Sequence, residues 1–299
     1  MTIPRPVTPG RFMMVTRRCA QRQFLLRPDD ETNNAFTYCL AEAAKRFGME
    51  IVMPSAMSNH HHNVLFDRFG LLPQFTEHFH KMLAKCMNCL RGRWENFWSS
   101  EQVCNVELID PSDVIDKVVY AATNPVKDGL VERVHHWPGV NGLSALLNDR
   151  PMTAKRPSHF FSEHGVMPET VSLVLVIPLE LGEREHVLAE IRAKVAIVEA
   201  TATEKRARSA TRVIGRRAIL RQTWWHSPTS REPRRNLRPT VAASSEWSRL
   251  EAIQRNAEFL CDYRDARAAW LLGGGAKFPP GTYWLRRFAN VPIAASKTN

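Results

Sequence analysis

The first 110 residues alternate between the two spacings of apolar side chains that distinguish helices from strands. In residues 30–47, apolar positions recur every three to four residues, as in a helix with one buried face, and Gly48 follows as a C-terminal cap. The predicted elements are a strand at 12–16, a helix at 30–47, strands at 50–53 and 61–66, a helix at 71–90 and a strand at 103–109. The β-α-β-β-α-β order is that of a ferredoxin-like sheet, so we predict an α+β fold.

Another helix is predicted after the fourth strand, and its start is well marked. Asp110 suits the N-cap position and Pro111 suits the first helical position. The apolar face contains Val114, Ile115, Val118, Val119 and Ala122, and a second face contains Asp116, Tyr120, Thr123 and Asn124. Because Pro125 disfavours helical geometry at the residue before it, we expect the helix to end at Asn124.

The second half of the chain is organised differently. Residues 148–167 form a connector rich in proline, arginine and histidine. The apolar run at 171–177 predicts a buried strand, and residues 180–208 have the pattern of one long helix. We therefore predict a first domain over residues 1–147. Over residues 148–299 we predict a connector and a mainly helical, basic extension that contains aromatic residues.

Positive charge is concentrated in one segment of this extension. The chain has 41 Lys and Arg against 30 Asp and Glu, a formal net charge of +11, and residues 201–240 contain eleven Lys or Arg and two Glu. Such a local field is typical of a surface that binds a polyanion such as nucleic acid, although a solvated basic face is an equal alternative. The candidate DNA-binding residues of the segment are Arg212, Arg216, Arg217, Arg234, Arg235 and Arg238. The tryptophans of the extension have two equal interpretations: they stack on DNA bases, or they pack in an ordinary hydrophobic core.

The cysteines and the hydropathy pattern narrow the class of protein. Six cysteines have no zinc-finger spacing, and the lone Cys86-Met-Asn-Cys89 pair lies in a predicted helix, which favours packed reduced thiols. No signal peptide and no apolar run of about 20 residues is found. We expect a cytoplasmic protein without a membrane segment.

The segment from Asn59 to Asn63 contains three consecutive histidines after a predicted strand. Side chains alternate along an extended chain, so His60 and His62 share one face and His61 points to the other. Two imidazoles on one face make half of a metal site, and the amide oxygen of Asn124 is a candidate third ligand. Mixed imidazole and oxygen ligation with open positions for phosphate oxygens suits Mg²⁺ or Mn²⁺.

Tyr120 lies one helical turn before Asn124, close enough to reach a phosphate held by the same ion. A divalent cation neutralises a phosphodiester and aligns it for in-line attack. A tyrosine nucleophile then forms a covalent intermediate, which allows rejoining without ATP. Each feature alone has an ordinary explanation: a surface or core histidine pair, a packing tyrosine, and a helix stop at Asn-Pro. The hypothesis depends on their combination.

Two segments resemble a known family. Residues 57–64 (MSNHHHNV) are similar to the M-P-N-H-x-H motif of single-tyrosine HUH transposases, and residues 120–131 (YAATNPVKDGLV) to their Y-x-x-x-N-P-V-x-x-G-L-V motif. The chain resembles in particular the REP-associated tyrosine transposases, with a C-terminal extension. The resemblance covers about residues 8–147. It implies an HUH endonuclease fold, metal ligation by His60, His62 and Asn124, and a 5′-phosphotyrosine intermediate on Tyr120.

The resemblance also implies an activity: metal-dependent nicking and rejoining of single-stranded or hairpin DNA, as in DNA transposition and recombination, by a monomer or homodimer. Two other functions stay open, a non-catalytic DNA-binding regulator and a phosphodiesterase in which water attacks. The chain departs from the motif at Ser58, His61 and Asn63, which replace proline, an apolar residue and leucine. Because His61 points to the other face of the strand, it must find a hydrogen-bond partner or water there.

Overall fold

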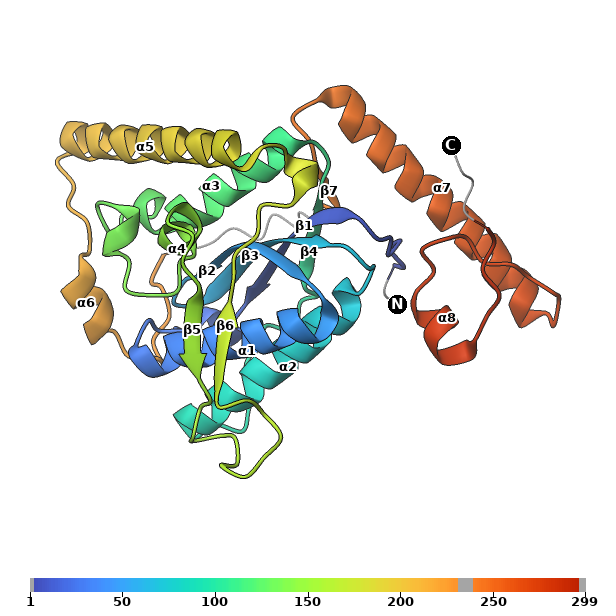
Figure 1. The fold of residues 1–299 in the computed structure, drawn as a ribbon, viewed down its shortest axis with the longest axis horizontal. Helices are drawn as coiled ribbons and strands as arrows, with labels where there is room; N and C mark the ends of the chain where they lie inside the picture. The colour runs from blue at the N-terminus through green and yellow to red at the C-terminus, as the bar shows by residue number, and fades with distance from the viewer. Residues whose placement is uncertain (1–2, 231–238, 296–299) are drawn as a thin grey trace.

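The computed structural model describes residues 3–230 and 239–295 and has an α+β architecture, as predicted (Figure 1). Its main sheet has the strand order β2-β3-β1-β4-β7. The strands are β1 (Arg11–Arg18), β2 (Glu50–Ala56), β3 (His60–Asp67), β4 (Cys104–Leu108) and β7 (Val241–Ala242). Strand β1 pairs antiparallel with β3 and β4, β2 pairs antiparallel with β3, and β7 adds a short parallel edge to β4.

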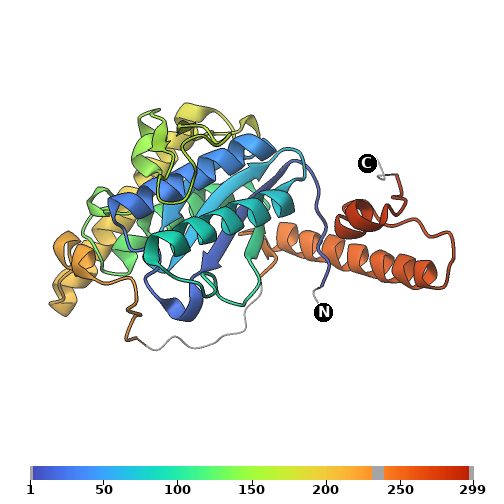
Figure 2. The same cartoon turned by 90° about the horizontal axis from the view of Figure 1, so that it is seen from below.

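Helices cover both faces of this sheet. Helices α1 (Asp30–Phe47) and α2 (Leu72–Arg91) lie side by side on one face, as Figure 2 shows from below. Helix α3 (Pro111–Lys127) lies on the opposite face, and α5 (Arg184–Ser209) packs on α3 from outside. The predicted bounds of α1 are accurate because both ends carry local signals. At the start, the Asp29 side chain accepts a hydrogen bond from the backbone N–H of Thr32, and at the end Gly48 adopts a left-handed conformation (φ 61°).

The expected end of α3 at Asn124 is wrong, because the helix continues through Pro125 to Lys127. Proline removes one N–H donor near the end of the helix and only biases the residue before it. Burial of Val126, which is 1% exposed, favours the additional turn. At this end of the helix, the backbone N–H groups of Leu130 and Val131 donate hydrogen bonds to the Pro125 carbonyl. Asn124 is therefore held in helical geometry within α3.

Two predictions in the second half also need correction. The strand expected at 171–177 ends early: β6 (Thr170–Leu173) pairs with β5 (Met152–Lys155), and Val174 is 60% exposed. The long helix expected from residue 180 begins later, at Arg184 of α5, because the 3-10 turn η3 (Leu179–Leu181) is followed by Gly182 at φ 109°, which a helix does not accommodate.

The extension is mainly helical, as expected, and continues the packing of the first half. The main core runs on past residue 147 to Ile219 of α6 (Arg216–Arg221), and the short α4 (Leu143–Leu147) also belongs to it. Helices α7 (Glu246–Leu271) and α8 (Trp284–Ala289) form an arm with its own small core around Phe278 (Figures 1 and 2). The division into two domains at residue 147 stays a prediction. No helix in the described part of the chain is long and apolar enough to cross a membrane.

Candidate active site

Strand β3 directs its histidines to two different environments. His62 is paired with Thr16 of β1 and Ser55 of β2, and its ring lies 5.4 Å from the ring of Tyr120 on α3. The ring of His60 lies 4.8 Å from that of His62, whereas His61 contacts Phe36 of α1 on the opposite face. The alternation predicted for the three histidines is confirmed.

Each histidine on the α3 face has its Nδ1 atom engaged. His60 Nδ1 lies 2.7 Å from the Oδ1 atom of Asn59, and His62 Nδ1 lies 2.8 Å from the hydroxyl of Thr16. The two Nε2 atoms therefore face the site. His60 Nε2 lies 3.3 Å from the amide nitrogen of Asn124, so the histidine pair and Asn124 come together as expected.

A divalent metal fits these residues. His62 Nε2 is buried and has no hydrogen-bond partner among the described residues, so this nitrogen is available to an ion. Burial, followed by the charges of His60, His61 and Lys117, lowers the pKa of His62 well below its ordinary value, so its imidazole is neutral as ligation requires. Rotation of the Asn124 amide would add an oxygen ligand.

No cluster of three or more His, Cys, Asp or Glu suited to a metal occurs in residues 3–230 and 239–295. An ion at this site would therefore depend on two imidazoles, one amide and oxygens from water or substrate. Cys86 of the Cys86-x-x-Cys89 pair is buried, as the prediction of packed thiols requires, whereas Cys89 is exposed, and both sulfurs contact His159.

Tyr120 is 38% exposed, which gives a substrate access to its hydroxyl. Burial and the carboxylate of Asp128 raise its pKa above the ordinary value, so the phenol is protonated at neutral pH. Two cations lie over the ring: the ammonium nitrogen of Lys127 is 5.3 Å and that of Lys117 is 5.8 Å from its centroid. Both ammonium groups therefore bring positive charge to the face of the Tyr120 ring.

Sequence reasoning missed these lysines. Lys117 lies three and Lys127 seven residues from Tyr120, the spacing of one helix face, and this signal was available in the sequence. Thr16 was not predictable in the same way, because its contact with His62 depends on the register between β1 and β3.

On the other face of the sheet, His61 has found protein partners. Its Nε2 lies 2.9 Å from Nε2 of His80 on α2, and the Asn63 amide nitrogen lies 3.2 Å from its Nδ1. The backbone carbonyl of His80 accepts from the indole of Trp98. Two departures from the family motif, His61 and Asn63, thus form one buried polar cluster.

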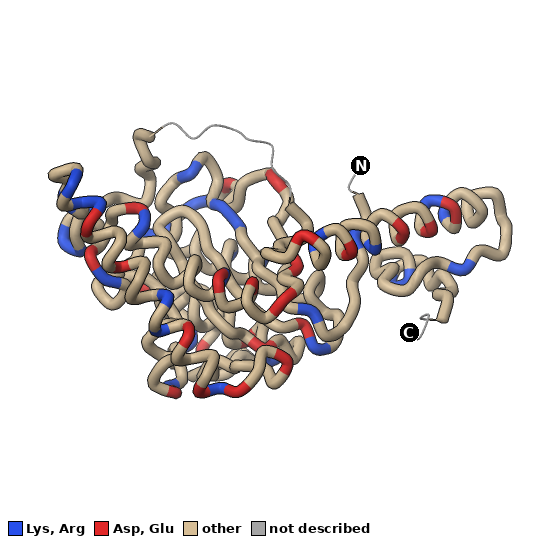
Figure 3. Tube along the Cα trace, turned by 90° about the horizontal axis from the view of Figure 1, so that it is seen from above, with Lys and Arg blue, Asp and Glu red and all other residues tan. Residues whose placement is uncertain are grey.

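Three of the candidate DNA-binding arginines lie beside the end of α3. Arg212, Arg216 and Arg217 are exposed. The backbone between them is bound to the segment that follows α3, because Ile214 and Gly215 donate to the carbonyls of Gly129 and Leu130. Figure 3 shows basic residues gathered where α5 ends and α6 begins. Arg234, Arg235 and Arg238 lie outside the described residues.

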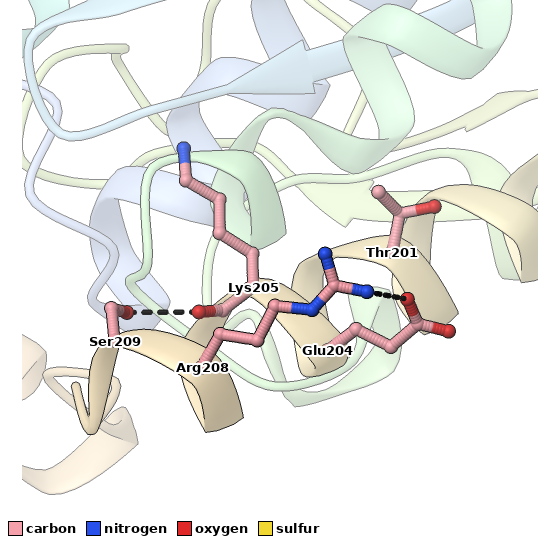
Figure 4. Close-up of a pocket in the computed structure, with 5 residues that line it drawn as sticks. All are labelled: Thr201, Glu204, Lys205, Arg208 and Ser209. Carbon is pink, nitrogen blue, oxygen red and sulfur yellow. Dashed lines mark hydrogen bonds and ion pairs between the residues drawn. The ribbon is translucent and has the colours of Figure 1, made fainter.

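The same end of α5 has an open pocket of about 310 Å³, lined by Thr201, Glu204, Lys205, Arg208 and Ser209 (Figure 4). Arg208 is paired with Glu204 at 3.5 Å, and Ser209 donates to the Lys205 carbonyl. None of the predicted metal ligands or Tyr120 lines it, so it adds basic surface and no catalytic group.

No family model and no curated protein matches the chain. Two solved structures are similar to it. A REP-associated tyrosine transposase bound to a REP hairpin shares 18% identity at a TM-score of 0.41, covering 50% of this chain and 86% of that one. A candidate transposase from Deinococcus radiodurans R1 shares 18% identity at a TM-score of 0.28, covering 36% and 85%. Both are described as transposases.

Proposed function

We propose that the protein is a metal-dependent endonuclease and strand transferase that acts on single-stranded DNA through Tyr120. One observation carries this proposal: His60, His62 and Asn124 come together on one face of β3. The ring of Tyr120, which is partly exposed, contacts His62 at the same place. Imidazoles and an amide are uncharged ligands, so a bound metal ion keeps its full positive charge. That charge is what a phosphodiester substrate needs.

Each residue has a role in the proposed reaction. His60, His62 and Asn124 would hold Mg²⁺ or Mn²⁺, which neutralises the scissile phosphate and aligns it. The Tyr120 oxygen attacks phosphorus as the bond from phosphorus to the 3′-oxygen breaks, and the phenol proton passes through water to that oxygen, which leaves as a 3′-hydroxyl. The 5′ phosphate stays on Tyr120 until a 3′-hydroxyl reverses the step. Lys117 and Lys127, whose ammonium groups lie over the Tyr120 ring, would add positive charge beside this step.

The DNA would approach along the end of α3. Arg212, Arg216 and Arg217 flank the backbone of residues 214–215, which is hydrogen-bonded to the segment just past this end, so phosphates on either side of the scissile one could reach them. A hairpin next to the cleaved strand is the substrate that the motif resemblance favours, and the hairpin-bound transposase is an example among the similar structures.

We also assign the β4-β1-β3-β2 part of the sheet, with α1 and α2 on one face, to a ferredoxin-like fold of the HUH endonuclease type. The assignment places the histidines on a central strand and Tyr120 on the helix that follows the last strand of the unit.

The test is covalent trapping. The protein is incubated with Mn²⁺ and hairpin-flanked oligonucleotides labelled on either side of the cleavage position. We expect the fragment on the 3′ side to become protein-linked, and Tyr120→Phe to abolish the adduct with little change in thermal stability. Tyr283→Phe, which removes an oxygen from another exposed region, is the matched control. An adduct formed by Tyr120→Phe would overturn the proposal.

One observation favours a second function, a phosphodiesterase in which water attacks. Burial and Asp128 raise the pKa of Tyr120, which makes its hydroxyl a weaker nucleophile. The same experiment separates the two functions. Metal-dependent cleavage that continues in Tyr120→Phe, and never gives a protein-linked fragment, identifies the hydrolase.

A further inference from the structure

The side chain of Asn59 lies between a backbone carbonyl and the first histidine of the candidate site. Its amide nitrogen is 3.2 Å from the carbonyl oxygen of Arg22, and its Oδ1 atom is 2.7 Å from Nδ1 of His60. An amide has one donating and one accepting side. Because the carbonyl of Arg22 can only accept, the nitrogen must face it and Oδ1 must face the imidazole.

This geometry determines the tautomer of His60. An amide oxygen accepts only, so Nδ1 must carry the proton and Nε2 must carry the lone pair. The contact on the opposite side of the ring is compatible with this tautomer, because Nε2 lies 3.3 Å from the amide nitrogen of Asn124. We propose that Asn59, oriented by the Arg22 carbonyl, is a positioning residue that sets His60 in the tautomer able to bind a metal; the proposal rests on the function proposed above.

The position of the Arg22 carbonyl is itself unusual. Gln21 (φ 51°) and Arg22 (φ 58°) are consecutive non-glycine residues in the left-handed region, which costs free energy and persists only where the surroundings impose it. Those surroundings are specific: Cys19 donates to the Asn59 carbonyl at 2.8 Å, and Leu26 donates to the Ser58 carbonyl at 2.9 Å. The strained turn is thus held against the segment that carries the histidines.

His62 lacks an equivalent control. Its Nδ1 partner is the hydroxyl of Thr16, which rotates and can either donate or accept. Thr16 therefore orients the ring of His62 without deciding its tautomer, whereas Asn59 does both for His60. The two ligands should respond differently when their partners are changed.

The test is ¹⁵N NMR of the imidazoles in the metal-free protein at roughly pH 8, above the ordinary histidine pKa of about 6.5, together with Mn²⁺ titration. In the wild type we expect His60 to carry its proton on Nδ1. Asn59→Asp keeps the accepting oxygen, so the tautomer stays and Mn²⁺ binds as tightly or more tightly. Asn59→Leu removes it, so the proton moves to Nε2 and Mn²⁺ affinity falls 10–100-fold, as is typical of outer-shell partners.

Backbone NMR spectra check that each variant is folded, and Thr16→Val is the matched control, for which we expect an unchanged His60 tautomer. A wild-type proton on Nε2 of His60, or an Asn59→Leu variant with unchanged tautomer and affinity, overturns the proposal. The proposed function fails separately: a wild type that shows the Asn59-dependent tautomer but binds no Mn²⁺ and forms no adduct supports the positioning role and overturns the nuclease.

Discussion

Two adjacent histidines of β3 are similarly buried but lie on opposite faces of the strand, in different surroundings. His61 and His62 are 0% and 5% exposed. On the α1 and α2 face, His61 is surrounded by aromatic rings and bonded to His80 and Asn63. On the α3 face, His62 lies beside His60, Asn124 and the partly exposed Tyr120. Neighbouring positions in one sequence motif thus belong to core and to candidate site.

Neither burial nor an unpartnered nitrogen distinguishes the two faces. His80 Nδ1 and His62 Nε2 are both buried without a partner in the described part of the chain. What differs is access: a second imidazole and an amide lie beside a histidine on both faces, but only on the α3 face do they lie next to a partly exposed tyrosine, Tyr120. A histidine becomes a candidate ligand through its neighbours, so changes on the two faces should have opposite consequences.

The largest effect is expected on the α3 face. His62→Ala removes a ligand, so Mn²⁺ affinity and adduct formation should each fall by more than about 100-fold, beyond the 10–100-fold typical of outer-shell partners. The unfolding free energy should change by roughly 1 kcal/mol. Isothermal titration, adduct trapping and urea unfolding measure the three quantities. Full Mn²⁺ binding by His62→Ala would remove this residue from the site.

His61→Ala should show the reverse pattern. The change leaves a cavity and strips His80 and Asn63 of their partner, so the unfolding free energy should fall by about 2–4 kcal/mol. Mn²⁺ affinity at a temperature where the variant is folded should stay within a few-fold. His135→Ala, at an exposed histidine, is the control and should leave both quantities unchanged. Loss of metal binding with intact stability would mean that the two faces are not separate.

Acid should destabilise the protein through the two buried histidines on the α1 and α2 face, His61 and His80. Burial lowers the pKa of His61 to about 3 and that of His80 well below its ordinary value, so the unfolded chain binds these protons more readily than the native one. Stability should therefore be full above pH 6.5 and fall as the pH drops from about 6.5 towards about 3, by up to about 1.4 kcal/mol per pH unit for each histidine.

Urea unfolding at a series of pH values measures this slope. The double variant His61→Leu with His80→Leu should have a shallower slope, since the two titrating groups are gone and leucine can pack against the surrounding aromatic rings. An unchanged slope would assign acid sensitivity to other groups.

The smallest effect concerns the basic segment. Changing Arg212, Arg216 and Arg217 to Gln should reduce the salt dependence of single-stranded DNA binding by about 0.7 in logarithmic slope for each phosphate that is no longer neutralised, about 2 in all. The control removes the same charge from the arm, at Arg264, Arg286 and Arg287. Fluorescence anisotropy at several salt concentrations measures both slopes. Equal reductions would show that only net charge matters.

The sequence alone determined the elements that local periodicity specifies. Alternation along an extended chain was enough to separate His60 and His62 from His61, and helical spacing was enough to place Asn124 one turn after Tyr120. The first α+β unit was predictable for the same reason, because its helices and strands have clear apolar periods and caps. The roles of these residues stay predictions.

Only the tertiary structure decided what each side chain meets. The partners of His61 and His62, His80 and Thr16, come from other elements, and their contacts depend on strand register and helix packing that local pattern does not encode. Pro125 stayed inside α3 because burial outweighed a backbone preference, and Gly182 delayed the start of a helix that the apolar pattern began at residue 180. Local spacing specifies the face that a residue occupies, and long-range packing decides whether that face becomes core or site.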